Sequence, residues 1–324
     1  RGNFAGRVFC SRVTRDACEY LLADSAHIQE SDADYLNYKL VRNQLSSVNP
    51  GKGGRKAYEK AARKLKNNGH RIDSGVVNGL ISRFHLNGAE PLYTSDDAVK
   101  AMGSFSGYPY GTPFTIGKNM TCTQYDAGHI LGSAISVIRT TLNGQTVTVC
   151  YTGDIGRFSK PILEDPTLVF PAEDLDIDLL IMESTYGNRR HAPVKDLKPE
   201  LQDILNSTFE RGGSVIIPAF AYGRTQELLY YIHELYQEGL VQKVPIYVDS
   251  PLATRITKVF GEHPEVYDQE THTTFLQKGK NPFSMPQLKF VGSVEESMAL
   301  NRDETPHIVI SASGMCEAGR ILHH

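Results

Sequence analysis

Beyond Arg189 the chain alternates between helical and strand patterns, and this alternation restricts the possible folds more than any other feature. Helical periodicity covers two segments, and short apolar runs typical of buried strands cover three. In chain order the segments are residues 197–209, 214–218, 225–237, 244–249 and 307–311. Strands that alternate with helices form parallel sheets, because each crossover needs a helix-length connection. We therefore expect a doubly wound α/β domain in this half of the chain.

Before Arg189 the pattern has a period of two residues, which is typical of antiparallel strands. Apolar and polar residues alternate at 134–139 and at 147–151, and Asn143-Gly144 lies between these two runs. Asn-Gly supplies the two residues of positive φ that a tight turn needs, so we expect a hairpin here. A buried strand is expected at 177–182. The change of pattern near residues 188–193 predicts a β-rich domain at 1–188 and a second domain at 189–324.

Composition and charge exclude several classes of protein. Hydrophobic residues make up 40% and charged residues 22% of the 324 residues, which is a globular rather than a disordered composition. No apolar run approaches the ~20 residues that cross a bilayer, so we expect no membrane partner. A net charge of -3 argues against a uniformly basic nucleic-acid binder, though not against a local basic patch. The five cysteines form no C-x-x-C pair, which favours a reducing, cytoplasmic compartment over a disulfide scaffold.

Both ends of the sequence are expected to be cut. Position 1 is Arg rather than Met, and no basic-then-apolar signal peptide follows it. The last residues, from Arg320 to His324, have the pattern of an unfinished helix. His323-His324 is either the start of a purification tag or native sequence, and we favour native residues in a truncated helix. We therefore expect a chain that holds only part of its functional site.

The N-terminal region is expected to be helical and then strongly basic. Thr14 is expected to cap the first helix, because Thr is a favoured N-cap residue. Between Lys52 and Arg71 there are eight Lys or Arg residues and one Glu, which gives a local net charge of +7 (8 − 1). This segment has two interpretations: a solvated surface helix, or an arm that contacts phosphates.

Polar and glycine residues follow the ends of four predicted strands. His129, Asp154 and Glu183 lie in the first three of these segments, and the fourth is residues 311–315. Side chains at strand ends converge on a crevice, so we expect His129, Asp154 and Glu183 to meet at one edge of the first domain. These residue types suit zinc or another divalent ion but are too few for a complete site. Taken singly, a His after Gly is more often structural, and a Thr-Gly-Asp turn is usually only a turn.

Six longer strings carry a resemblance to a known family. They are YDAGHILGSA (125–134), YTGDIGR (151–157), ESTYGNR (183–189), IPAFAYGRTQELL (217–229), VDSPLA (248–253) and SASGMCEAGRILHH (311–324). In this order they resemble the β-CASP branch of the metallo-β-lactamase superfamily, and within it the RNA-cleaving members that include the endonuclease of pre-mRNA 3′-end processing. The resemblance implies an α/β fold in which a partial metallo-β-lactamase αββα sandwich carries an inserted, Rossmann-like β-CASP cap domain.

The resemblance also implies a two-zinc site that hydrolyses RNA phosphodiester bonds. His129 matches a metal-binding His, Asp154 matches the Asp that bridges both ions, and Glu183 matches an acid that orients a catalytic His. In such a site two zinc ions activate a water and hold the phosphate for in-line attack. The family's H-x-H-x-D-H motif and its C-terminal His motifs do not occur in this sequence. We therefore expect this chain alone to bind zinc poorly and to cleave single-stranded RNA negligibly.

RNA phosphates are expected to bind at two places in the second domain. Arg224 follows a strand end and either holds a phosphate bidentately or forms a structural ion pair with an acid such as Glu227. The second place comprises Ser311, Ser313, Gly314 and Met315. These residues are expected to lead into a helix that begins at Glu317, whose N–H groups and dipole would bind an anion.

Three alternatives to a ribonuclease stay open. The first is a non-catalytic scaffold subunit of an RNA-processing complex, which retention of His129, Asp154 and Glu183 argues against. The second is a DNA nuclease of the repair branch of the same family. The third is a small-molecule hydrolase, which the long second domain argues against. For the ribonuclease we expect single-stranded RNA as the partner, with a homodimer or an RNA-processing complex as the assembly.

Overall fold

The computed structural model describes residues 4–48, 62–67, 71–190, 197–277, 279 and 281–324. The chain forms two compact units: the first is Arg1–Gly6 with Cys18–Ser104, and the second is Arg7–Ala17 with Phe105–His324. The predicted domain boundary near 188–193 falls partly on residues 191–196, which lie outside the described residues. Residues 49–61 and 68–70, which hold most of the basic segment, also lie outside them.

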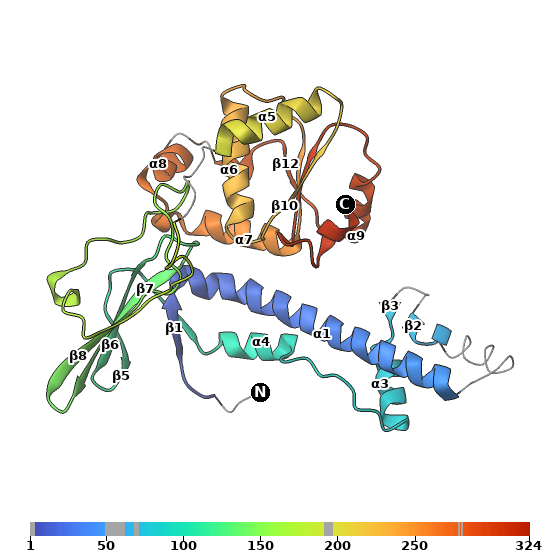
Figure 1. The fold of residues 1–324 in the computed structure, drawn as a ribbon, viewed down its shortest axis with the longest axis horizontal. Helices are drawn as coiled ribbons and strands as arrows, with labels where there is room; N and C mark the ends of the chain where they lie inside the picture. The colour runs from blue at the N-terminus through green and yellow to red at the C-terminus, as the bar shows by residue number, and fades with distance from the viewer. Residues whose placement is uncertain (1–3, 49–61, 68–70, 191–196, 278, 280) are drawn as a thin grey trace. The chain divides into compact units, whose positions relative to one another are not determined.

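A long helix, α1 (Arg12–Val48), is the main element of the first unit, although its first six residues belong to the second (Figure 1). The other elements of the first unit are β2 (Lys66–Asn67), β3 (Arg71–Ile72), α3 (Ser74–Arg83) and α4 (Ser95–Met102). Its core consists of Val41, Leu45, Leu65 and Val77. The prediction that Thr14 caps the helix was wrong. Ser11 takes that position, because its Oγ accepts a hydrogen bond of 3.1 Å from the Thr14 N–H.

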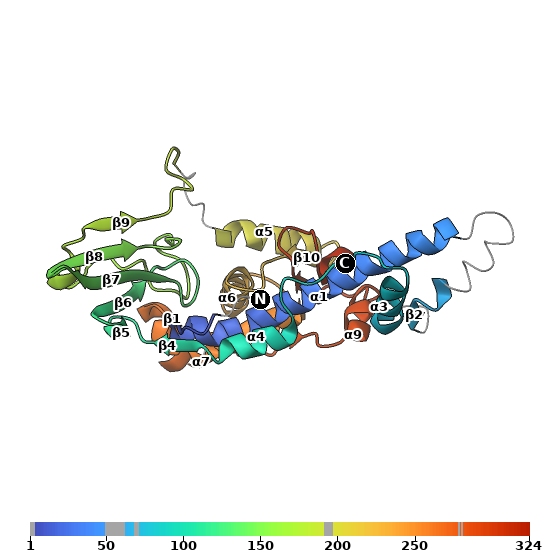
Figure 2. The ribbon, with the colours of Figure 1, turned by 90° about the horizontal axis from the view of Figure 1, so that it is seen from below.

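The second unit contains a five-stranded sheet in the order β5-β6-β7-β8-β9 (Figure 2). Its strands are β5 (Phe114–Gly117), β6 (Met120–Asp126), β7 (Ala134–Leu142), β8 (Gln145–Tyr151) and β9 (Leu179–Ile181). Neighbouring strands are antiparallel except β8 and β9. The predicted hairpin is present between β7 and β8, where Asn143 and Gly144 have φ of 52° and 81°. A separate parallel pair joins β1 (Val8–Ser11) to β4 (Phe105–Tyr108).

A second sheet in this unit has four parallel strands in the order β10-β13-β11-β12. The strands are β10 (Val215–Pro218), β11 (Ile246–Asp249), β12 (Leu288–Phe290) and β13 (Ile308–Ser311). The associated helices are α5 (Leu197–Phe209), α6 (Arg224–Gln237), α7 (Pro251–Glu262) and α9 (Val294–Leu300). The predicted α/β class is confirmed, and β12 and α9 are elements that the sequence patterns did not predict.

Helices cover both faces of the parallel sheet (Figure 1). Ile308 and Ile310 of β13 pack in one cluster with Leu205 of α5 and with residues of α6. Val309, which points to the opposite face, packs with Leu300 of α9. The inner strand β13 is therefore buried on both of its faces, as its continuous apolar sequence requires, whereas the edge strands β10 and β12 keep exposed residues.

The remaining elements are short. They are α8 (Gln269–His272), a π-helix at Thr273–Gln277, and 3₁₀-helices at Ala172–Asp174, Pro264–Val266, Pro282–Ser284 and Arg320–His323. The predicted α-helix beginning at Glu317 is therefore wrong. A turn precedes the last 3₁₀-helix, and Gly319 in that turn has φ of 85°, which favours glycine. Among the described residues, no helix is long and apolar enough to cross a membrane.

Replacing Ile310 with alanine tests the core of the parallel sheet. Ile310 is 1% exposed on the central strand, so Ile310→Ala should lower the free energy of unfolding by about 2–5 kcal/mol. Ile216→Ala on the edge strand β10, where the side chain is 45% exposed, should cost less than about 1 kcal/mol. Urea unfolding followed by circular dichroism measures both changes. Equal costs at the two positions would contradict this assignment of the core.

Candidate active site

The loop between β6 and β7 carries His129 and needs glycine at two positions. Gly128 has φ of 62°, and an added Cβ would lie 2.7 Å from the Pro166 ring. Gly132 has φ of 85°, and its added Cβ would lie 3.0 Å from the backbone nitrogen of Thr14. These close approaches explain both glycines of the string that contains His129.

Side chains from several elements bind the backbone of this loop. The Ser133 Oγ accepts hydrogen bonds from the backbone N–H groups of His129 (3.1 Å) and Ile130 (3.3 Å). The loop carbonyls accept hydrogen bonds from Lys160, Ser11, Thr14, Tyr110 and Tyr222. The first of these joins the Lys160 Nζ to the His129 oxygen at 2.9 Å, and Tyr222 donates to the Leu131 oxygen. The backbone that presents His129 is therefore tied to residues far away in the sequence.

Asp154 lies beside His129, in the turn that follows β8. The Asp154 Oδ2 is 3.9 Å from the His129 Nε2, and the two side chains are 76% and 41% exposed. The turn packs tightly on the His129 loop, since the Gly156 N–H donates to the Ala127 oxygen at 2.8 Å. An added Cβ on Gly156 would lie only 1.8 Å from the Gly128 oxygen. No other residue type fits at position 156 without moving one of the two loops.

Glu183 supports the turn that presents Asp154. It follows β9, and its Oε1 accepts a 2.8 Å hydrogen bond from the backbone N–H of Ile155. That hydrogen bond is the main cause that lowers the pKa of Glu183, and the nearby His129 lowers it further. The structure thus brings the three strand-end residues together in the second unit, as the sequence pattern leads one to expect.

The donor set of His129 and Asp154 agrees with zinc in type. Two ligand atoms on one tetrahedral zinc lie about 3.3 Å apart when each bond is about 2.0–2.1 Å, so the 3.9 Å gap needs only a small side-chain shift. Glu183 is engaged with the Ile155 N–H. Across the described residues, no group of three or more His, Cys, Asp or Glu side chains is placed to hold a metal ion. His129 and Asp154 are therefore two candidate ligands rather than a complete site.

Arg224 is the first residue of α6 and forms the ion pair that the sequence left as an alternative. Its Nη1 lies 2.8 Å from the Glu227 Oε2, while the Arg224 side chain stays 46% exposed. A pocket of about 270 Å³ is lined by Arg224 and also by His129. A guanidinium has five N–H donors, so the pair with Glu227 leaves donors for a phosphate.

The predicted anion site at Ser311, Ser313, Gly314 and Met315 lacks the helix on which it was based. The Ser311 Oγ is buried and donates to the Asp249 oxygen at 3.0 Å. The Ser313 N–H donates to the Ala318 oxygen at 3.1 Å. An added Cβ on Gly314 would lie 3.0 Å from the Phe220 nitrogen, and Met315 is exposed. With no α-helix after residue 315, there is no helix dipole to favour an anion here.

A buried cluster around Asp249 was not predicted from the sequence. The fully buried Asp249 carboxylate accepts hydrogen bonds from Arg320 (2.5 Å) and Ser297 and lies 2.7 Å from the His324 Nε2. The His324 side chain is 1% exposed and also contacts Asn301. The only available signal was the acid at a strand end in the string VDSPLA.

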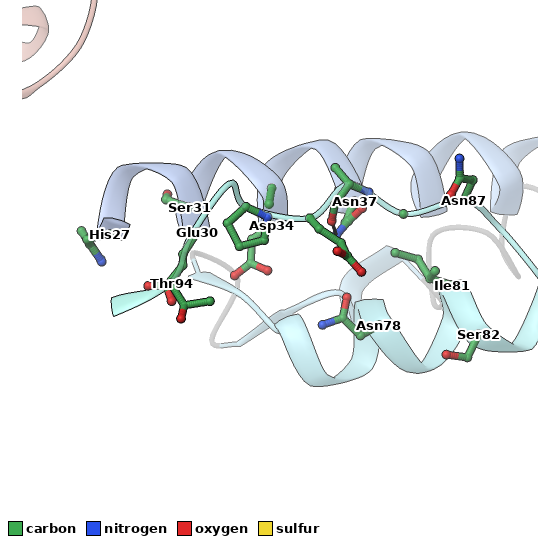
Figure 3. A pocket seen from close by; sticks show the side chains of 15 residues that line it. His27, Glu30, Ser31, Asp34, Asn37, Asn78, Ile81, Ser82, Asn87 and Thr94 are labelled. Atoms are coloured by element: carbon green, nitrogen blue, oxygen red, sulfur yellow. Dashed lines mark hydrogen bonds between the residues drawn. The ribbon is translucent and has the colours of Figure 1, made fainter. Parts of the chain in front are cut away.

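A wider pocket, of about 900 Å³, lies in the first unit and holds none of the candidate residues. Side chains of α1 and α3 face it, among them Asp34 and Asn78 (Figure 3). Its carboxylates are bonded within the unit: Asp34 accepts from Ser74 at 2.5 Å, and Glu30 accepts from Ser95 at 2.8 Å.

Comparison with known proteins shows what the sequence of this chain is similar to. Residues 225–324 match the family described as the Beta-Casp domain. This chain carries a Beta-Casp domain. A ribonuclease of Thermus thermophilus is 39% identical over 236 residues, which cover 72% of this chain and 52% of the ribonuclease. The transcription termination factor FttA is 32% identical in Methanosarcina mazei and 31% in Thermococcus kodakarensis, over 72% of this chain and 36% and 35% of those proteins.

The β-CASP resemblance found in the sequence is therefore confirmed. The chain spans about half the length of the ribonuclease and about a third of the length of the termination factors that it matches.

Replacing Gly156 tests the contact between the two loops of the candidate site. Gly156→Ala should lower the free energy of unfolding by about 3 kcal/mol, because the new Cβ meets the Gly128 carbonyl. Gly261→Ala on α7, where nothing lies within 4 Å of an added Cβ, should be neutral or stabilising by up to about 1 kcal/mol. Thermal unfolding compares the two variants. A Gly156→Ala protein as stable as the wild type would show that the loops are not in contact.

Asp126, which ends β6, should make stability depend on pH. The pKa of Asp126 is raised to about 7, mainly by burial and also by the nearby Glu164, although a hydrogen bond from the Gly128 N–H opposes the shift. The folded protein then keeps a proton that the unfolded chain has lost between pH ~4 and ~7, so this group lowers stability as the pH rises through that window.

Asp126→Asn should remove this contribution while keeping the oxygen that accepts from Gly128. The variant should therefore gain stability relative to the wild type as the pH is raised from 4 to 8. Denaturant unfolding at several pH values gives the difference. A stability difference that is constant across this range would show that Asp126 has an ordinary pKa.

Proposed function

We propose that the protein containing this chain is a zinc-dependent, RNA-processing ribonuclease that hydrolyses phosphodiester bonds of single-stranded RNA. The observation that carries the proposal is the convergence of His129, Asp154 and Glu183 at strand ends, next to a pocket that Arg224 lines. The Beta-Casp domain and the ribonuclease of Thermus thermophilus support the same conclusion.

In this proposal His129 and Asp154 hold zinc. When bound, zinc lowers the pKa of a coordinated water and stabilises the charge that develops on a phosphate. Asp154 suits this position because its carboxylate is exposed and faces the imidazole. Glu183 acts on the backbone: by accepting from the Ile155 N–H it holds the turn in which Asp154 lies.

Arg224 binds the substrate strand in this proposal. Its exposed guanidinium lies at the same pocket as His129, so a phosphate next to the scissile bond can reach both. The complete ligand set is expected only in the longer polypeptide. The 324-residue chain alone should therefore bind zinc weakly and cleave little RNA.

Action during termination of transcription is a second candidate. Relatives named as transcription termination factors match the same share of this chain as the ribonuclease does, at lower identity. Cleavage of a nascent transcript would account for both the ribonuclease and the termination-factor names of these relatives. We place the ribonuclease first because the identity to it is higher.

Replacing Asp154 in the full polypeptide tests the proposed reaction. Asp154→Ala should reduce cleavage of labelled single-stranded RNA by more than roughly 100-fold, since it removes a metal ligand rather than a partner of one. The fold should be unchanged, because the carboxylate is exposed. Single-turnover cleavage with added zinc measures the rate, and thermal unfolding measures the fold.

Asp203→Ala, an exposed acid on α5, is the matched control and should cleave as the wild type does. A DNA strand of the same sequence distinguishes the DNA-nuclease alternative. Full activity of Asp154→Ala would contradict the assigned site, and faster cleavage of DNA would replace the proposed substrate. A wild-type polypeptide that binds RNA without cleaving it would favour the scaffold alternative.

A further inference from the structure

The pocket beside His129 has two chemically different parts. It is small, about 270 Å³, near the lower end of the range for ligand sites. One part is apolar and includes Ile130, Ile162, Phe220 and Phe260. The other contains the side chains of Lys160, Arg224 and Glu227. A ligand that fills it must be short, with one flat or apolar part and one anionic part.

Lys160 is the central cation of this pocket. It is half-buried, and its Nζ donates to the His129 oxygen at 2.9 Å, which uses one of the three N–H donors of an ammonium group. The remaining donors of Lys160 and the half-exposed guanidinium of Arg224 line the same pocket, so they favour a phosphate there.

Phe220 gives the apolar part an exposed aromatic ring. It lies in the segment between β10 and α6, and it is 55% exposed although it lines the pocket. An exposed aromatic ring offers a surface on which a planar ligand can stack. Nucleobases stack on such rings whatever their sequence, because every base has a π-face.

We propose that this pocket binds one nucleotide of the RNA strand, with its phosphate on Lys160 and its base against Phe220. The inference rests on the proposed function and deepens it, since it names the substrate unit next to the candidate metal ligands. Because Lys160 also holds the His129 carbonyl, an occupied pocket places the strand at a fixed position relative to the imidazole.

Binding of small probes to the full polypeptide tests this pocket. The probes are AMP, adenosine and inorganic phosphate, titrated by calorimetry in EDTA so that no metal contributes to phosphate binding. AMP should bind at least about tenfold more tightly than adenosine or phosphate, because only AMP fills both parts of the pocket. Equal binding of AMP and inorganic phosphate would overturn the nucleotide assignment and leave a simple anion site.

Variants separate the two parts of the pocket. Lys160→Gln keeps a donor for the His129 carbonyl but removes the charge, so AMP should bind roughly tenfold more weakly and Lys160→Arg should restore most of the affinity. For a single-stranded oligonucleotide, Lys160→Gln should reduce the salt slope by about 0.7, the value of one phosphate contact. Phe220→Ala should weaken the binding of AMP at least about fivefold and leave the binding of phosphate unchanged.

Lys258→Gln on α7, whose side chain is 68% exposed, is the matched control and should bind AMP as the wild type does. Thermal unfolding of each variant shows whether it is folded. Unchanged AMP binding in folded Lys160→Gln and Phe220→Ala would overturn the proposal.

The same preparations distinguish this inference from the proposed function. A wild-type protein that cleaves RNA but shows no preference for AMP would contradict the nucleotide pocket and support the proposed ribonuclease function. A protein that binds AMP through Lys160 without cleaving RNA would support the nucleotide pocket and contradict the proposed ribonuclease function.

Discussion

The backbone hydrogen bonds of the loop between β6 and β7 are the interaction on which the candidate site depends. The carbonyl groups of residues 129 and 131–133 are bound by side chains from the start of α1, from the segment before β5, from the loop after β8 and from the turn before α6. The backbone carbonyls of a loop are usually exposed to water, and hydrogen bonds to water do not fix the conformation of the loop. Here each hydrogen-bonded carbonyl fixes the backbone that carries His129 relative to one more part of the second unit.

Two parts of the second unit meet at this loop. Lys160 and the Gly156 backbone approach it from the first half of the unit, and the Tyr222 hydroxyl approaches it from the turn before α6. The pocket that contains Lys160 and Arg224 lies where these segments meet. The residues proposed to hold zinc and the residues proposed to bind the RNA strand are thus positioned by one shared set of contacts.

Local patterns predicted the parts of the fold that depend on neighbours in the chain. The period-two runs and Asn143-Gly144 specify the hairpin of β7 and β8, and α6 begins within one residue of its predicted start. The strand-end rule predicted that His129, Asp154 and Glu183 lie close together, because their positions follow from where strands end, whereas their proposed roles came only from the family resemblance.

Long-range contacts account for what local patterns missed. From the sequence alone Lys160 resembles any surface lysine. In the folded protein its amine lies beside the His129 carbonyl, 31 residues away in the sequence. Arg320 and His324 extend a helical pattern, but the buried Asp249 carboxylate contacts both Arg320, which begins a short 3₁₀-helix, and His324, which follows its last residue. Partners this distant leave no periodic trace in the sequence, so only the assembled structure reveals them.

The strand order of the parallel sheet has a consequence for how the protein is made. β13 lies between β10 and β11, although it follows both in the chain. During synthesis the two earlier strands therefore have no shared neighbour until residue 311 has left the ribosome, at least 90 residues after β10. Their facing edges, which carry backbone N–H and C=O groups, stay unpaired for that interval, and non-local sheets are exposed to misassembly until such edges are paired. Insertion of β13, with burial of Ile308 and Ile310, joins β10 to β11, so this sheet is expected to form only after β13 has been made rather than strand by strand.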